Sequence, residues 1–440
     1  MKNIRLFFWL LKGILVRYYK IILVSFVGGV LLVLCTIYFG PWALTLIKRD
    51  HKVIGLVGNF TPTNLPLSIQ RLLSSGLTDI DDAGEVVPAI ATVWQISEDG
   101  KIYTFHLRNN LYWHDGQKFT SADINYNLKD VEFKPSETDE FQVKLKNPFS
   151  PLPSFLSKPI FKKGLVGLGT YKISAIKLKG DSVTNLRLTS PAADLPVLEF
   201  KFYPSETVAK TAFKLGEVDV LNEITHLDRL NESKNIKNKE IVKFNWYVGV
   251  FYNNLDPFLK DKTVRQALTY AIDKPEKNRI STPLSTKSWA YTNRVKQYER
   301  DIDQSKKMIS KLISSESADL TITTFNDNVQ LAQSIASAWE ALGIHAKVKV
   351  ESGMPDNYQV LIATQEIPSD PDQYALWHST QTQTNISHYD SKKIDKLLED
   401  GRKENDREKR KKIYQDFQRF LVEDAPAAFL YHPTTYTIYR

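Results

Sequence analysis

One stretch of this chain, residues 87–123, constrains the fold more than any other. It holds two short segments in which apolar and polar residues alternate, separated by Glu98-Asp99-Gly100. In the second segment Tyr103, Phe105 and Leu107 alternate with polar residues, as a half-buried strand requires. Asp-Gly between two such segments is a strong hairpin signal, because glycine tolerates the positive φ of a tight turn. The stretch therefore predicts an antiparallel hairpin.

A helix start is predicted at the end of the same stretch. His114-Asp115-Gly116 provides a second turn, and residues 120–123 read Thr-Ser-Ala-Asp. The Thr120 hydroxyl can cap a free backbone N–H, and the Asp123 carboxylate favours the positive end of a helix. These patterns predict a twisted antiparallel unit that leads into a helix, and they name no function.

The stretch also resembles a family signature. Its residue order is similar to that of the family 5 extracellular solute-binding proteins, the oligopeptide-, dipeptide- and nickel-binding components of ABC importers. The matching positions are Pro88, Ala91, Trp94, Ser97, Asp99, Gly100, Tyr103, Phe105, Leu107, Arg108, Trp113, His114, Asp115, Gly116, Thr120, Ala122 and Asp123. Residues 257–274 resemble a second part of the family pattern, and the resemblance extends from about Val53 to Tyr431.

The resemblance implies an α/β fold with two lobes, of the periplasmic-binding-protein-like kind (type II, large peptide-binding cluster). We expect one N-terminal transmembrane helix to precede it. Residues 125–163 are compressed relative to the family, which suggests a shortened sub-domain. The expected boundaries are a cytoplasmic N-terminus over 1–20, a transmembrane helix over 21–47, lobe I over 52–255 with the sub-domain around 77–165, lobe II over 256–425, and a return to lobe I over 426–440.

The charge distribution argues against nucleic acid as a partner. The formal net charge is +8, and residues 1–49 carry seven Lys and Arg and no acid. Subtracting these seven leaves +1 for residues 50–440. A body this close to neutral offers no strongly basic surface to a phosphate backbone.

An anchor is predicted from the apolar run over residues 21–47, which holds no charged side chain and can cross a hydrocarbon layer of about 30 Å. Basic residues precede the run, so the positive-inside tendency places the N-terminus in the cytoplasm and the soluble domain outside. A cleaved secretory signal would have a shorter apolar core and a small-x-small site. A lipoprotein signal would need a small residue before Cys35, where Leu34 stands.

The sequence contains no catalytic or metal-binding pattern. Cys35 is the only cysteine, and the eight histidines show no spacing typical of a metal site. No serine lies in a Gly-x-Ser-x-Gly elbow. His114 has no adjacent nucleophile, so a structural hydrogen bond is the favoured role. We expect no enzyme, no metal and no cofactor.

Two short motifs that could suggest a site are better explained as turns. Asp370-Pro371-Asp372 is a good turn and helix-start sequence, and its loop lacks the density of carboxylates that calcium needs. Gly167-Leu168-Gly169 opens into a strand, so it presents no helix N-terminus to a phosphate.

The resemblance implies ligand binding in a cleft that closes between the lobes. Peptide receptors of this family pair with the ligand backbone as an added β-strand. Carried onto this chain, the pairing edges are Asn59-Phe60-Thr61 in lobe I and Thr364-Gln365-Glu366 in lobe II. Trp246 begins an apolar strand that ends at Asn253-Asn254, and this pair is expected at a crossover between the lobes. Trp377-His378 either packs in the core or forms part of the cleft wall.

One position departs from the family pattern. Peptide receptors usually carry an Asp just before the Asp-Pro turn that pairs with the α-ammonium group of the ligand. Spacing from Asp370 puts Ile367 at that place. Either Glu366 takes over by a shift of one residue, or the ligand has no free amine, because an unpaired buried ammonium group is costly.

We therefore expect a membrane-tethered receptor that captures oligopeptides and delivers them to the permease subunits of an ABC importer. Two alternatives stay open from the sequence. One is a sensory or scaffold ectodomain that kept the fold without transport, and the other is a receptor for a non-peptide ligand. The expected partners are the peptide, the permease and, through the N-terminus, the cell membrane.

The anchor can be tested on the mature protein. If residues 21–47 are retained, the protein keeps its N-terminus, remains in membranes after a high-salt wash and exposes the chain beyond Asp50 on the outside. Intact-protein mass spectrometry and protease accessibility measure these properties. A mature chain that begins at a lipid-bearing Cys35 would contradict the prediction.

Overall fold

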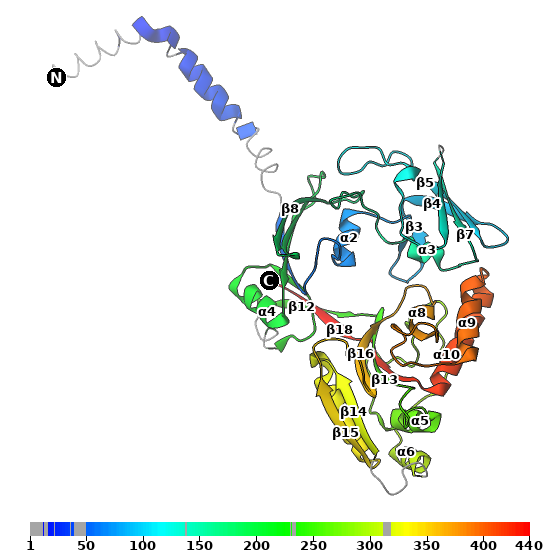
Figure 1. Cartoon of the computed structure of the whole chain (residues 1–440). Helices are drawn as coiled ribbons and strands as arrows, with labels where there is room; N and C mark the ends of the chain where they lie inside the picture. Colours follow the sequence, from blue (N-terminus) through cyan, green and yellow to red (C-terminus); the bar gives the residue numbers. More distant parts are fainter. Residues whose placement is uncertain are drawn as a thin grey trace, which may run out of the picture.

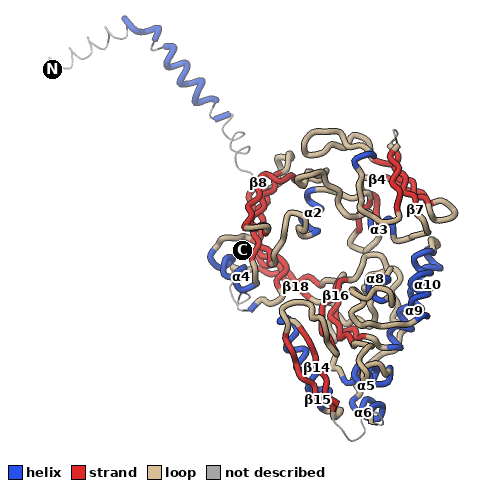
Figure 2. Tube along the Cα trace, in the orientation of Figure 1, coloured by secondary structure: helices blue, strands red, loops and turns tan. Residues whose placement is uncertain are grey.

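Figure 1 shows the computed structural model of the chain of 440 residues. The structure describes residues 50–136, 139–228, 230, 235–310 and 318–440, together with 12, 16–21, 23–35 and 37–38. The body has two lobes and a smaller sub-domain, and mixes strands with helices as the predicted α/β class requires (Figure 2).

Lobe I is built on a seven-stranded sheet in the order β12-β18-β11-β1-β10-β9-β8. β1 lies parallel to both β10 and β11, so the amino ends of these strands share one edge of the sheet. Helix α2 packs on one face of the sheet and α4 on the other. The elements are β1 (His51–Val57), α2 (Leu67–Leu73), β8 (Lys172–Lys179), β9 (Ser182–Thr189), β10 (Val197–Tyr203), α4 (Glu206–Leu215), β11 (Val220–Ile224), β12 (Lys237–Val242) and β18 (Thr434–Tyr439).

The sub-domain contains the predicted hairpin. β4 and β5 pair antiparallel around Gly100, whose φ of 67° is the left-handed value that the turn requires. Tyr103, Phe105 and Leu107 are buried in its core, as their alternation predicts. The elements are β2 (Thr78–Ile80), β3 (Val86–Pro88), β4 (Ala91–Ile96), β5 (Ile102–Leu107), η1 (Ser121–Asp123), β6 (Val131–Pro135), β7 (Glu140–Leu145) and α3 (Leu152–Phe155).

The helix start predicted at Thr120 is a single turn only. The Thr120 N–H and hydroxyl both donate to the Asp123 carboxylate, at 2.8 and 3.2 Å, but the helix is limited to the 3-10 turn η1. Ile124 and Tyr126, two residues apart, both bury their side chains in the sub-domain core. This spacing requires an extended backbone rather than a helix.

Lobe II is built on a five-stranded sheet in the order β15-β14-β16-β13-β17. One hydrophobic core contains residues of α9 and α10, and the other contains residues of α5 and α7. The elements are β13 (Trp246–Tyr252), α5 (Lys262–Ala271), α6 (Ile302–Ile309), β14 (Ala318–Thr324), η3 (Asn326–Asn328), α7 (Val329–Glu340), β15 (Ile344–Val350), β16 (Val360–Glu366), α8 (Tyr374–Trp377), α9 (Lys392–Lys403), α10 (Arg407–Asp424) and β17 (Ala427–Tyr431).

The chain crosses between the lobes at residues 243–245 and 432–433, which corrects the boundaries expected at 255/256 and 425/426. β13 belongs to the lobe II sheet, because its run of buried residues is covered on both faces. β17 pairs with β13, and only β18 returns to the lobe I sheet. Asn253-Asn254 therefore follows the far end of β13 and is not at a crossover.

One helix among the described N-terminal residues, Val16–Cys35, is long and apolar enough to cross a membrane, with a mean hydropathy of 2.1. It overlaps the first part of the span predicted over 21–47. Residues 22, 36 and 39–47 of that prediction lie outside the described part of the chain. A signal sequence near the N-terminus can also contain a helix that meets these criteria of length and hydropathy, so the helix is compatible with an anchor and with a signal.

The Gly167-Leu168-Gly169 motif serves close packing. The His114 ring contacts both glycines: Nδ1 accepts from the Gly167 N–H at 3.3 Å, and Nε2 bonds to the Gly169 carbonyl at 2.9 Å. A Cβ on Gly167 would overlap the Leu73 carbonyl oxygen. The favoured structural role of His114 is confirmed, and the two glycines allow the chain to bend against the main chain at the end of α2.

Gly167→Ala should therefore destabilise the protein by about 1–3 kcal/mol, because backbone rather than a flexible side chain must move. Gly353→Ala is the matched control, since no heavy atom lies within 4 Å of the place that its new methyl group would take. It should stay within about 0.5 kcal/mol of the wild type. Urea denaturation measures both, and equal stability of the two variants would refute the packing role.

Candidate functional site

Three cavities lie between the lobes and together form what we call the inter-lobe cleft. The wide cavity, of about 430 Å³, lies between lobe I residues such as Arg71 of α2 and lobe II residues such as Lys287 and Glu366. The helix cavity, of about 190 Å³, lies between the sub-domain and the start of α10. Gly84 and Ser369 line both, so these two cavities are continuous.

The third cavity, the hinge cavity, lies at the crossovers and has a volume of about 420 Å³. Its walls include Trp246 and Thr364 from lobe II and Thr434 from the start of β18. Trp246 is the strand partner of Glu366, which lines the wide cavity. The hinge and wide cavities therefore meet at the same end of the β13–β16 pair.

Glu366 is the one acid of the predicted site that lines the wide cavity. Burial raises the pKa of its carboxyl group, and the positive charge of Lys158 in the sub-domain opposes that rise. Within the described residues it forms no ion pair. An ionised carboxylate in this position is an electrostatic partner for a cation that enters from solvent.

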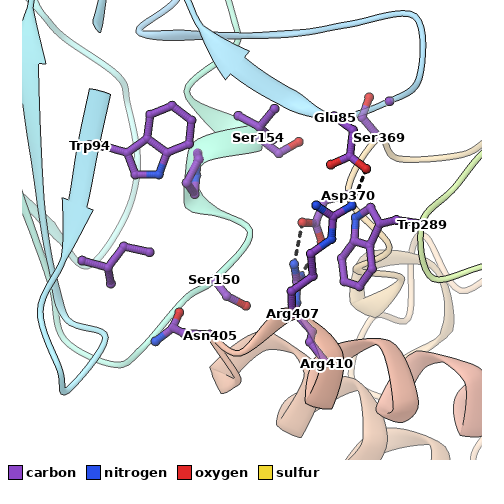
Figure 3. Close-up of a pocket in the computed structure, with 14 residues that line it drawn as sticks. Glu85, Trp94, Ser150, Ser154, Trp289, Ser369, Asp370, Asn405, Arg407 and Arg410 are labelled. Carbon is purple, nitrogen blue, oxygen red and sulfur yellow. Dashed lines mark hydrogen bonds and ion pairs between the residues drawn. The ribbon is translucent and has the colours of Figure 1, made fainter. Parts of the chain in front are cut away.

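Both aromatic and cationic side chains line the helix cavity. Trp94 of β4 and Trp289 line it from opposite lobes (Figure 3). The guanidinium groups of Arg407 and Arg410 lie 5.1 and 5.7 Å from the Trp289 ring centroid. Such stacking holds the indole in place at the cavity wall.

The Asp-Pro-Asp turn is tied to the helices behind it by two ion pairs. Asp370 accepts from both Nη atoms of Arg410, at 2.8 and 2.5 Å, and Asp372 accepts from Arg402 Nε at 2.8 Å. Burial alone would lower the pKa of Arg410, but the Asp370 carboxylate outweighs burial and raises it. The structural role predicted for the turn is confirmed, and the pairs position the segment that follows Glu366.

The sub-domain contacts lobe II at the ends of α9 and α10. The Ser150 N–H donates to the Arg402 carbonyl at 2.8 Å, and Arg407 forms an ion pair with Glu85 (Figure 3). Gly100 lies so close to Asn405 that a Cβ would overlap the side-chain amide. These contacts join the sub-domain to lobe II at the lining of the helix cavity.

The other predicted site residues lie outside the wide and helix cavities. Trp377 is 2% exposed and packs against Phe251 and Phe429, so it is a core residue and not cleft wall. His378 is 4% exposed and stacks on Tyr374 within lobe II. Trp377 and His378 lie at the end of α8, and α9 packs against this helix and helps to bury both side chains.

The predicted pairing edge of lobe I lies in the loop after β1. Phe60 packs on Phe202, with ring centroids 5.3 Å apart, and its carbonyl accepts from the Val183 N–H at 2.7 Å. Its neighbours Asn59 and Thr61 are at least partly exposed. None of the three lines the cavities described above, and the same holds for Gln365. Asn253 and Asn254 bond to main-chain atoms of lobe II.

Sequence reasoning missed the cationic and aromatic residues of the cleft. Arg71, Lys287, Trp289 and Arg407 occur in no motif. The long irregular stretch between α5 and α6 is a signal that could have pointed to Lys287 and Trp289, but not to the two arginines. Within the described residues, no group of three or more His, Cys, Asp or Glu side chains is arranged to hold a metal ion.

Comparison with known proteins places this geometry in a family. The profile described as "Bacterial extracellular solute-binding proteins, family 5 Middle" matches residues 85–388. The "Dipeptide-binding protein" of Escherichia coli (strain K12) is 25% identical over 447 residues, covering 80% of this chain and 82% of that protein.

Solved structures show the same fold. NikZ from Campylobacter jejuni in complex with Ni(L-His) superposes with a TM-score of 0.76 at 23% identity, covering 89% of this chain and 94% of that chain. The oligopeptide-binding protein AppA from Bacillus subtilis, in complex with a nonapeptide, gives 0.71 at 20% identity, with coverage of 89% and 95%. These two proteins hold different kinds of ligand, so the shared fold does not select one.

Asp370→Asn should cost about 3–5 kcal/mol of stability, because it leaves the buried guanidinium of Arg410 without its charge partner. Asp400→Asn is the matched control: Asp400 pairs with Lys396 on the exposed face of α9, where an ion pair contributes less than about 1 kcal/mol. Urea denaturation of both variants measures the difference. Similar losses in the two variants would show that the Asp370 pair does not hold the turn.

Proposed function

The chain belongs to the bacterial extracellular solute-binding proteins, family 5, and from that membership we propose that it captures oligopeptides in the inter-lobe cleft and delivers them to the permease of an ABC importer. The proposal takes the protein to be a receptor and not an enzyme. The relatives that match along most of their length carry names of binding proteins, which supports this assignment.

The observation that carries the peptide assignment is the Glu366 carboxylate. It lines the widest of the cleft cavities and has no ion-pair partner within the described residues. A peptide brings one α-ammonium group at its N-terminus, which would complete the pair. A one-residue shift from the family position accounts for this, because Ile367 is 3% exposed and faces the lobe II core.

The strand that carries Glu366 supports pairing with a ligand backbone. β14 pairs with β16 only over Val360 to Ile362, whereas β13 pairs along the whole of β16 up to Glu366. Among the described residues, the last residues of β16 therefore have a strand neighbour on one side alone. A peptide added on the other side would gain main-chain hydrogen bonds that do not depend on its sequence.

We propose further that the N-terminal helix is retained as a single-pass anchor, with the body outside the cytoplasm. The apolar helix Val16–Cys35 supports a membrane-crossing role by its length and composition. An anchored receptor would keep captured peptides close to the permease in the same membrane.

Glu366→Gln should weaken peptides with a free N-terminus by about 2–5 kcal/mol, as when one member of a buried charge pair is lost. N-acetylated peptides should bind poorly to the wild type and lose little more in the variant. Because burial raises the pKa of Glu366, wild-type affinity for free peptides should fall as pH drops towards this raised value, and the variant should lack that dependence. Tryptophan-fluorescence titration with a peptide library measures all of these affinities.

Glu340→Gln is the matched control, since Glu340 is an exposed acid at the end of α7. It should leave every affinity unchanged. Equal affinity of wild type and Glu366→Gln for free and acetylated peptides would remove the ammonium anchor and point to a ligand without a free amine.

A further inference from the structure

The amino ends of the parallel strands of lobe I form an edge that lies opposite the cleft. β18 shows this directly: it begins at Thr434 in the hinge cavity and ends beside the first residues of β11 and β12. Its six residues span about 20 Å at roughly 3.3 Å each. We call the far side the amino edge, and define it as Asp50–Lys52, Lys172, Asp194, Lys214–Asp219, Lys237–Lys239 and Arg440.

The chain reaches the amino edge directly from its apolar N-terminal segment. No charged residue occurs between Ile21 and Ile47, and only three residues separate Ile47 from the start of β1 at His51. The four steps from Ile47 to His51 span at most about 14 Å. If residues up to Ile47 stay in the membrane or its interface, the start of β1 at the amino edge lies close to the membrane surface.

The side chains of the amino edge suit such a surface. Leu215, the last residue of α4, is 73% exposed. It lies beside Arg440, whose guanidinium donates to the Lys214 carbonyl at 3.0 Å. An exposed apolar side chain next to cations suits a membrane interface, where burial of apolar area and attraction to anionic lipid act together.

The charge of the amino edge favours anionic lipid. The Lys and Arg side chains of the amino edge outnumber its Asp and Glu side chains. Within the described residues none of these cations forms an ion pair; the cations are Lys52, Lys172, Lys214, Lys237, Lys239 and Arg440. The acids are Asp50, Asp194, Glu217 and Asp219, and the Asp219 carboxylate already accepts from the Val53 N–H at 2.8 Å. Each unpaired cation near an anionic surface contributes attraction that salt screens.

We propose that the amino edge of lobe I rests on anionic phospholipid of the membrane that anchors the chain, with Leu215 in the headgroup layer. The inter-lobe cleft then lies on the opposite side of lobe I and opens away from the membrane, where ligands arrive. Handover to a permease in the same membrane requires this edge to lift from the surface. The proposal depends on retention of the N-terminal segment and not on the identity of the ligand.

The test uses the full chain in lipid nanodiscs that carry a quencher on the lipid headgroup. In a Cys35→Ser background, a fluorescent label is placed by Leu215→Cys, or by Leu255→Cys as a matched control. Leu255 is 72% exposed but lies in lobe II, beyond the far end of β13. We expect at least twofold stronger quenching at position 215 than at 255 in phosphatidylglycerol discs, and a loss of that difference in high salt.

A charge variant separates lipid contact from simple proximity to the anchor. Lys214→Glu combined with Lys237→Glu should cut the quenching at 215 in phosphatidylglycerol discs at least twofold, while ligand affinity stays unchanged because neither lysine lines the cleft cavities. Equal quenching at 215 and 255 would overturn the proposal. Quenching at 215 that is the same in phosphatidylcholine and phosphatidylglycerol discs would also overturn it.

Discussion

The two-lobed arrangement depends on the burial of β13. Six of its seven residues are buried, and it has β16 on one side and β17 on the other. A strand that is apolar on both faces is stable only inside a sheet that is covered on both sides. The chain must therefore enter lobe II before Trp246 and cannot leave before Tyr431. Since Val248 and Tyr431 are strand partners, the two crossovers lie next to each other and form one narrow hinge.

The same constraint organises the cleft. Antiparallel pairing of β13 with β16 brings Glu366 to the crossover end of the sheet, beside the hinge cavity. The position of the turn that follows is fixed by ion pairs of Asp370 and Asp372 with arginines of α10 and α9. Those helices also meet the sub-domain through Ser150 and Glu85. One connected set of ion pairs and main-chain bonds thus sets the position of the acid relative to both walls.

The hinge cavity and the start of β1 lie at opposite ends of the parallel strands of lobe I. The hinge cavity takes residues from the carboxyl end of β11, whereas the N-terminal segment joins the sheet at the amino end of β1. Parallel neighbours must run in one direction, so a tether at the start of β1 cannot lie beside the cleft. If the N-terminal segment is retained as the proposed anchor, the parallel sheet restricts the orientation that the cleft can take relative to the membrane.

Local patterns in the sequence determined the β4–β5 hairpin, the turn over residues 114–116 and the cap of Thr120, because each depends on neighbours within a few residues. They also predicted that residues 246–252 form a buried strand, but burial does not say which sheet receives it. Tertiary structure decided where the chain crosses between the lobes. It also decided that Trp377 lies in the core and that Glu366 lines the wide cavity. Trp377 is buried by Phe251 and Phe429, and the side of the sheet on which Glu366 lies depends on its strand register with Trp246. In each case the partners are far apart in the sequence. Contacts of that kind leave no periodic signal in a single sequence.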